Sequence, residues 1–419
     1  MSSVIIGHDD FAGLVGARAH KLLQLAHFLS ARRSDPMALT RPLVADLLSQ
    51  AIQIEELLDT YGARNNRKWS RFRSLTATIK LFADVAYHLL HIQYTLPAYR
   101  LLPLERDFAQ ATAQVLTFTH DVLIKAAGWM IVQANRLDLP IPSEAVAPTD
   151  YLEPLPPGRL PHDRPMRKTR SASETITHLA TAYLNLAAES DLLYVVEQVT
   201  PAQYPSCFPD PLSEDSLQYL EFRFHSLQSL YDTHVSETEI EFLDTDLPIL
   251  RGHISIVYRL LETATQLVHY YERHLNVQTG DSSLRRKPVI PARTLLAMLM
   301  EYSIAYAKHY LVQGRRFCHT MLKRYAQVGS IEVSVPTYRG FHVRPATLVA
   351  KIVRHYGSDI HMELDGQSYD ASSPMDIFRA NEKINAQKRR WLVSEIGRLS
   401  LPKGELNDQQ TRATVLEVV

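Results

Sequence analysis

The chain has 419 residues, of which 46% are hydrophobic, so it is long enough for two to four domains and for a sizeable core. Lys plus Arg and Asp plus Glu each number 45, and this balance gives no overall field that would favour nucleic acid or an anionic membrane as a partner. The two cysteines, Cys207 and Cys318, form no Cys-x-x-Cys pair, which excludes the zinc and redox motifs built on such pairs.

The ends and the hydropathy of the chain bear on its location. Asp9 and Asp10 lie near the N-terminus without a basic start, which argues against a secretory signal. No uninterrupted apolar run approaches 18 residues, so we predict no membrane span. Two lone thiols suit a reducing compartment. We therefore expect a cytoplasmic protein.

The first three quarters of the chain show the spacing of apolar residues that is typical of helices. Eight prolines between residues 140 and 165 and a basic run at 164–170 predict a linker or an extended strap over residues 140–172. The predicted helices cover residues 11–60 with a break at 32–42, and residues 72–94, 104–137, 173–199, 216–234, 247–276 and 291–327.

The predicted helical halves, residues 1–139 and 173–326, are similar to each other. Asp59 precedes a long helix that begins near Arg73, and Asp232 precedes one that begins near Arg251. The two long helices align with their apolar positions broadly in phase. We interpret the pattern as a duplicated helical bundle, and the alternative is that two helices of similar period align by chance.

A different pattern begins at residue 327 and predicts an α+β domain over 327–419. Ile331, Val333 and Val335 alternate with polar residues as a half-buried strand does. Asp365-Gly366 is a hairpin signal. The predicted order is strand 331–335, helix 345–356, strands 359–364 and 367–370, a helix from Ser373-Pro374 to about 399, and strand 411–419. The fold class is therefore mostly α with a C-terminal α+β domain, an open-faced β-sandwich.

A candidate anion site lies between the first predicted strand and the first helix of this domain. Gly340 permits a tight turn, and Pro345 can begin a helix without losing a hydrogen bond. Free amides of a first helical turn attract anions, and Arg344 adds a planar donor for phosphate oxygens. The neutral ring of His342 is a nucleophile near pH 7. A lone histidine at a helix start is more often an ordinary surface residue, but its neighbours favour a site here.

Residues 340–346 resemble the active-site motif of the histidine-containing phosphocarrier (HPr) family, which reads Gly-aliphatic-His-x-Arg-Pro-Ala. The resemblance covers about the last fifth of the chain. It implies that His342 accepts a phosphoryl group from an enzyme I-like donor of a bacterial phosphotransferase system, and that Arg344 stabilises the phosphate. Gly340, Pro345 and Ala346 would shape the phosphate-binding start of the helix.

The resemblance extends to a regulatory serine, but the chain also differs from the family pattern at several positions. Ser373 corresponds to the serine that a regulatory kinase phosphorylates in some members of the family. The second helix continues past the family's glycine-rich turn, and the chain ends where the family has its last helix. Pro374 replaces an apolar docking residue, which implies weaker binding of enzyme I or of the serine kinase. The domain would then be a carrier, a sensor or a relic that no longer carries phosphate.

The other histidines predict neither a metal site nor a cofactor. His88 and His91 are three residues apart, and His269 and His274 are close in sequence, but no His-Glu-x-x-His motif accompanies them. No Walker loop, dinucleotide fingerprint or serine-hydrolase elbow occurs. Packing and surface roles are the simpler interpretation of these residues.

Three functions follow as hypotheses. In the first, the chain is a phosphorelay or regulatory protein whose helical region senses or binds a partner. In the second, the HPr-like domain is a structural part of a scaffold or assembly protein and carries no phosphate. In the third, the helical region is an enzyme with an HPr-like regulatory tail, which a deep polar pocket between the halves would favour. The expected partner is a phosphoryl donor or another protein, with homo-oligomer formation as a further option.

Overall fold

The structure, a computed structural model, divides into two compact units that are described separately. The helical unit comprises Met1–Thr175 and Glu189–Phe317, and the C-terminal unit comprises Ile176–Ala188 and Cys318–Val419. The residues described are 5–31, 39–143, 146–156, 158, 160–161, 163, 165, 171–275, 288–325, 329–335, 340–356, 359–398 and 407–418.

The helices predicted in the first three quarters of the chain are all present, with ends that differ by a few residues. They are α1 (His8–Arg18), α2 (His20–Ala31), α3 (Arg41–Thr60), α4 (Ser70–Thr95), α5 (Phe108–Arg136), α6 (Ala172–Glu189), α7 (Glu214–His234), α8 (Ile240–Leu243), α9 (Asp246–Tyr270), α10 (Ala292–Met298) and α11 (Ala305–Tyr325). The main difference is that α6 ends ten residues earlier than predicted, and a 3₁₀ segment, Asp191–Glu197, follows it.

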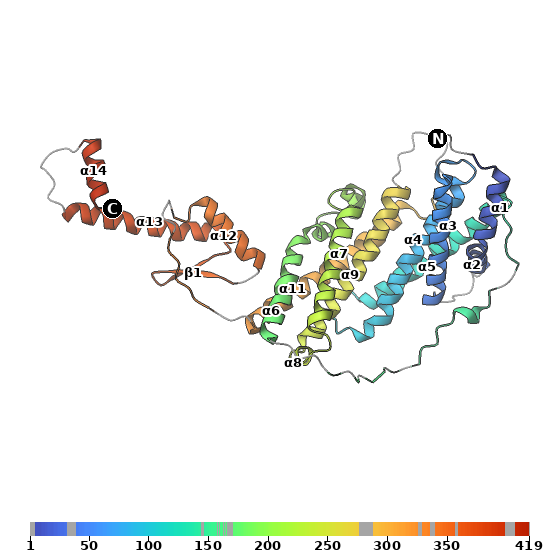
Figure 1. Ribbon diagram of the computed structural model, residues 1–419, viewed down its shortest axis with the longest axis horizontal. Helices are drawn as coiled ribbons and strands as arrows, with labels where there is room; N and C mark the ends of the chain where they lie inside the picture. Colours follow the sequence, from blue (N-terminus) through green and yellow to red (C-terminus); the bar gives the residue numbers. More distant parts are fainter. Residues whose placement is uncertain are drawn as a thin grey trace. The chain divides into compact units, whose positions relative to one another are not determined.

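Helices α4 and α9 lie at the centre of the helical unit and pack against each other (Figure 1). Helix α3 packs on α4, and α7 packs on α9, so the four helices lie side by side in the order α3, α4, α9, α7. Helix α5 also packs on α4, and it contacts α2 as well. Helix α9 buries most of its length, because its apolar residues are not confined to one stripe.

The same ion pair occurs in both halves. The Arg73 guanidinium donates to both carboxylate oxygens of Asp59, at 2.7 and 2.6 Å. The Arg251 guanidinium does the same to Asp232, at 2.8 and 2.9 Å. The first pair links the end of α3 to the first turn of α4, and the second links the end of α7 to the first turns of α9. This repetition supports the interpretation of a duplicated bundle.

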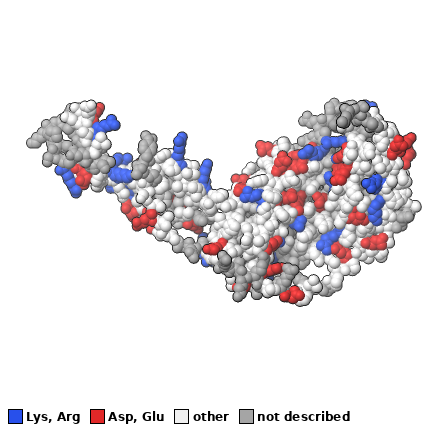
Figure 2. Space-filling model, viewed as in Figure 1, with Lys and Arg blue, Asp and Glu red and all other residues white. Residues whose placement is uncertain are grey.

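Helix α5 is the one helix among the described residues that is long and apolar enough to cross a membrane, by length and composition alone. It packs along α4 and α2 in the helical unit. Figure 2 shows Lys and Arg side chains interspersed with Asp and Glu over the visible face of this unit. Positive and negative side chains are therefore mixed on that face and are not separated into patches of one sign.

The described part of the proline-rich linker is held against α3. The Tyr151 hydroxyl donates to Asp46 at 2.5 Å, and the Thr40 hydroxyl donates to the Tyr151 carbonyl at 2.6 Å. Arg41 and Glu153 form an ion pair beside these contacts. The basic run at 164–170 lies almost wholly outside the described residues. The described residues around Tyr151 and Glu153 are thus anchored on α3.

The C-terminal unit contains a two-stranded antiparallel sheet among its described residues. Helix α12 (Val343–Tyr356) precedes β1 (His361–Leu364) and β2 (Gln367–Asp370), and α13 (Pro374–Arg398) and α14 (Asp408–Val418) follow. Both turn residues have positive φ, 49° at Asp365 and 70° at Gly366, as the predicted tight hairpin requires. Helix α12 packs on α13, and both strands also contact α13. The fold class, mostly α with a C-terminal α+β part, is confirmed.

Two predicted strands of this unit are wrong. Residues 331–335 form no strand and pair with no strand among the described residues, and Ile331 and Val333 are 83% and 64% exposed. The segment predicted as strand 411–419 is helical from Asp408 to Val418. The Asn407 side chain accepts from the Gln410 amide at 2.8 Å, and the Gln410 side chain accepts from the Asn407 amide at 3.1 Å. This capping box starts a helix where β-branched residues suggested a strand.

Candidate functional site

His342 lies directly before α12, and its carbonyl accepts the amide of Ala346 at 3.0 Å. The His342 side chain is half-buried, and Arg344, the second residue of the helix, is exposed. The helix begins at Val343, so Pro345 lies in the first turn and not at its first position. Proline costs no hydrogen bond there, because amides of the first turn have no acceptor within the helix.

A buried asparagine holds the loop before His342. The Phe341 amide donates to the Asn381 side-chain oxygen at 2.7 Å. Asn381 belongs to α13 and is 2% exposed. Gly340 has φ 60°, in the left-handed region, and a side-chain carbon there would overlap the same Asn381 oxygen. The close approach of α13 to the loop thus requires glycine at 340.

Sequence reasoning did not identify Asn381. A signal exists, because Asn381 is four residues after Ile377 and one after Ala380, within a row of residues that face the core. A polar side chain in such a row needs a hydrogen-bond partner when it is buried. The partner, the Phe341 amide, is 40 residues away and cannot be inferred from spacing alone.

The loop is also fixed by apolar packing. The Phe341 ring packs against a small core formed by Ala346, Ala350 and Ile377. Val349 and Met362 complete this cluster from α12 and β1. His342 therefore follows a residue anchored both through its backbone amide and through its side chain, which restricts the backbone at His342.

The first turn of α12 provides the electrostatic features of an anion site. The Ala346 amide donates to the His342 carbonyl, and Pro345 has no amide hydrogen. The amides of Val343 and Arg344 then remain as the donors of the first turn, at the positive end of the helix. The exposed Arg344 guanidinium adds a positive charge on the same turn.

Ser373 lies at the start of α13. Its hydroxyl accepts the Asp376 amide at 3.3 Å, and its own amide donates to the Asp370 carbonyl at 3.1 Å. Arg354 of α12 donates to the carbonyl of the neighbouring Ser372 at 2.9 Å. The half-buried Ser373 thus caps the helix next to an arginine.

The histidine pairs His88/His91 and His269/His274 lie in the helical unit. His88 lies between Asp84 and Glu262, with ring nitrogens 3.3 and 3.2 Å from their carboxylates. His269 contacts Glu214 at 2.8 Å, and His274 stacks on Tyr270. No group of three or more His, Cys, Asp or Glu side chains in the described part of the chain is arranged to hold a metal ion.

Residues 330–385 match the family model for the PTS HPr component phosphorylation site. The matched segment includes the His342 loop, α12, both strands and the part of α13 that carries Asn381. Comparison of the chain with the curated proteins and with the solved structures found no match. The C-terminal region therefore carries an HPr-family domain, as predicted, and this supports a phosphocarrier or regulatory role of the phosphotransferase-system type.

Proposed function

We propose that His342 accepts a phosphoryl group from an enzyme I-like donor, and that the helical unit is the sensor or partner-binding part of the same regulatory protein. The observation that carries the proposal is the placement of His342 at the start of α12 within the segment that matches the HPr family. Asn381 and the Phe341 ring anchor the residue before His342, and this would restrict the backbone that carries the imidazole before a donor protein arrives.

The local geometry suits the chemistry of phosphoryl transfer. A neutral imidazole nitrogen attacks the phosphorus, and the bond between phosphorus and the donor breaks as the new P–N bond forms. The phosphoryl group brings roughly two negative charges to the start of α12. The helix dipole, the amides of Val343 and Arg344, and the Arg344 guanidinium would stabilise these charges.

Incubation of the chain with phosphoenolpyruvate and enzyme I should place acid-labile phosphate on the wild type and none on His342→Ala. His355→Ala is the matched control, because His355 is an exposed histidine on the same helix. Radiolabel or intact-mass measurement gives the stoichiometry. Absence of phosphate on the wild type, or its persistence in His342→Ala, would contradict the proposal.

The scaffold function has one observation in its favour. Helix α13 continues to Arg398, beyond the matched segment, and exposes Trp391 and Val393 at 53% and 69%. An exposed apolar helix end is suited to contact with another protein. The experiment on His342 also separates these functions, since a scaffold takes up no phosphate and tolerates His342→Ala.

For Ser373, we expect stability and regulation to respond differently to two substitutions. Ser373→Ala removes the cap of α13 and should cost about 1 kcal/mol of stability in the C-terminal unit. Ser373→Asp keeps a capping oxygen and should remain stable, while its negative charge near the docking surface slows phosphorylation of His342. Thermal unfolding and the rate of phosphate uptake measure the two effects. Equal rates in both variants would exclude the regulatory role.

A further inference from the structure

A pocket of about 360 Å³ lies in the helical unit where α3 and α4 of the first half meet α7 and α9 of the second. Each helix contributes residues one turn apart. The polar lining residues are Lys80 and Asp84 from α4, Glu214 and Gln218 from α7, and Thr265, Gln266 and His269 from α9. Its volume falls in the range of small-molecule sites.

The charge of Lys80 is already balanced. Its ammonium pairs with Glu55, which also lies 3.0 Å from Arg73. Arg73 in turn pairs with Asp59. The network holds two cations and two anions, so Lys80 offers hydrogen bonds to the pocket with little net attraction for an anion.

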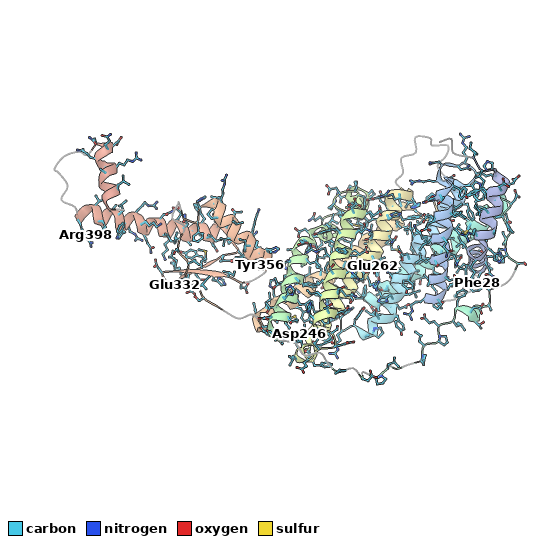
Figure 3. All side chains as sticks on the ribbon, viewed as in Figure 1. Phe28, Asp246, Glu262, Glu332, Tyr356 and Arg398 are labelled. Carbon is cyan, nitrogen blue, oxygen red and sulfur yellow. The ribbon has the colours of Figure 1, made fainter. Side chains whose placement is uncertain are left out.

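The charge of Asp84 is balanced in the same way. His88 bridges Asp84 and Glu262, and Glu262 also pairs with Arg259 at 2.7 Å. Burial alone would lower the pKa of His88, but its contacts with the two carboxylates raise it to about 9, so the ring is charged at neutral pH. Figure 3 marks Glu262 among the central helices. This network again holds two cations and two anions.

Glu214 and His269 leave hydrogen-bonding capacity in the pocket. His269 Nδ1 lies 2.8 Å from Glu214 Oε1, and a proton on Nδ1 leaves the lone pair of the imidazole on Nε2. Glu214 Oε2 is buried without a hydrogen-bond partner among the described residues and has a cation, Arg273, at 3.4 Å. The amide groups of Gln218 and Gln266 add both donors and acceptors.

We propose that this pocket binds a small uncharged molecule rich in hydroxyl groups, a polyol or a monosaccharide. Each hydroxyl both donates and accepts, which matches a wall where donors and acceptors alternate one turn apart. Because Lys80, Asp84 and Glu214 each have a partner of opposite charge within the protein, the wall offers little net attraction to an anion or to a cation. Leu48, Ile52 and Leu81 form an apolar side that suits the C–H face of such a ligand. The proposal is independent of phosphorylation at His342.

The test is calorimetric titration of the full chain with D-glucose, D-fructose, D-mannitol and myo-inositol, and with L-glutamate and inorganic phosphate as charged probes. Saturable one-to-one binding of a neutral probe is expected. Gln218→Ala should weaken it about tenfold by removing a rim hydrogen bond, and Ile52→Trp should abolish it by filling the opening. Both positions are exposed, so the substitutions spare the core.

Gln53→Ala and Gln53→Trp are the matched controls, because Gln53 is exposed on α3 next to Ile52 and does not line the pocket. They should bind like the wild type, and so should His342→Ala. The proposal is overturned if no neutral probe binds up to about 10 mM, if only glutamate or phosphate binds, or if Gln218→Ala and Ile52→Trp bind as well as the Gln53 variants.

Discussion

Replacement of His88 by glutamine should lower the free energy of unfolding of the helical unit by about 3–5 kcal/mol. The charged ring lies between two carboxylates, and the His88 side chain is 12% exposed. Glutamine has a similar size but no charge, so Asp84 loses its cation and Glu262 keeps only Arg259. The Asp84 and Glu262 side chains are 24% and 11% exposed, and a largely buried carboxylate without a counter-charge is costly, because the interior solvates it poorly.

The pH dependence of stability should identify this effect. The pKa of His88 is raised from 6.5 to about 9 in the folded chain, so its contribution is fully present below pH 6.5 and is lost as the pH rises towards 9. The loss amounts to about 3 kcal/mol. Burial lowers the pKa of His91 to about 4 and that of His274 to about 3, so stability also falls below pH 6.5. Maximum stability is expected near pH 6.5.

Denaturant unfolding of His88→Gln and of the wild type between pH 4 and pH 9 tests both statements. Trp69 and Trp129 report on the helical unit, and Trp391→Phe in both proteins removes the signal of the C-terminal unit. His27→Gln, at an exposed position of α2, should change stability by less than about 0.5 kcal/mol. If His88→Gln retains the loss of stability between pH 6.5 and 9, the charged-histidine account is wrong.

The second large effect is expected at Gly340. Gly340→Ala should destabilise the start of α12 by about 2–4 kcal/mol, of which the left-handed backbone accounts for about 1–2 kcal/mol. The remainder comes from the overlap with the Asn381 oxygen, which would break the hydrogen bond to Phe341 and leave buried groups without partners. Phosphate uptake at His342, where it occurs, should fall with it.

Gly366→Ala separates the two contributions. Gly366 also has a left-handed backbone, φ 70°, but a side-chain carbon there would meet no atom within 4 Å. It should therefore lose only about 1–2 kcal/mol. Hydrogen exchange at the amides of α12, α13 and the hairpin measures the local free energies. Equal losses at the two glycines would show that Asn381 does not constrain the loop.

The sequence predicted those elements whose signals are local. Apolar spacing located the long helices, Asp365-Gly366 located the hairpin, and Ser373-Pro374 located the start of α13. The strand at 331–335 failed because a strand depends on a partner, which alternation alone does not provide. Helix α14 was missed although its signal is local, since Asn407 and Gln410 are spaced as a capping box.

The candidate site was predictable in part. The Gly340, His342 and Arg344 pattern predicted a helix start after His342, and α12 begins at Val343; the anion site itself stays a prediction. Asn381 and the pocket were not predictable, because each depends on residues brought together from distant elements. In the sequence, Lys80, Glu214 and His269 have the spacing of ordinary helix residues. Only the packing of four helices brings them to one pocket.

The anchoring of the proline-rich stretch on α3 shortens the unanchored connection between α5 and α6. Helix α5 ends at Arg136 and α6 begins at Ala172, which leaves 35 residues between them. The contacts of Tyr151 and Glu153 divide this connection, so that 18 residues follow the last anchored position. Halving a flexible loop reduces its closure entropy by only about 0.6 kcal/mol. The larger consequence is geometric, because the length of chain between this anchor and the start of α6 is 18 residues and not the 35 of the whole connection.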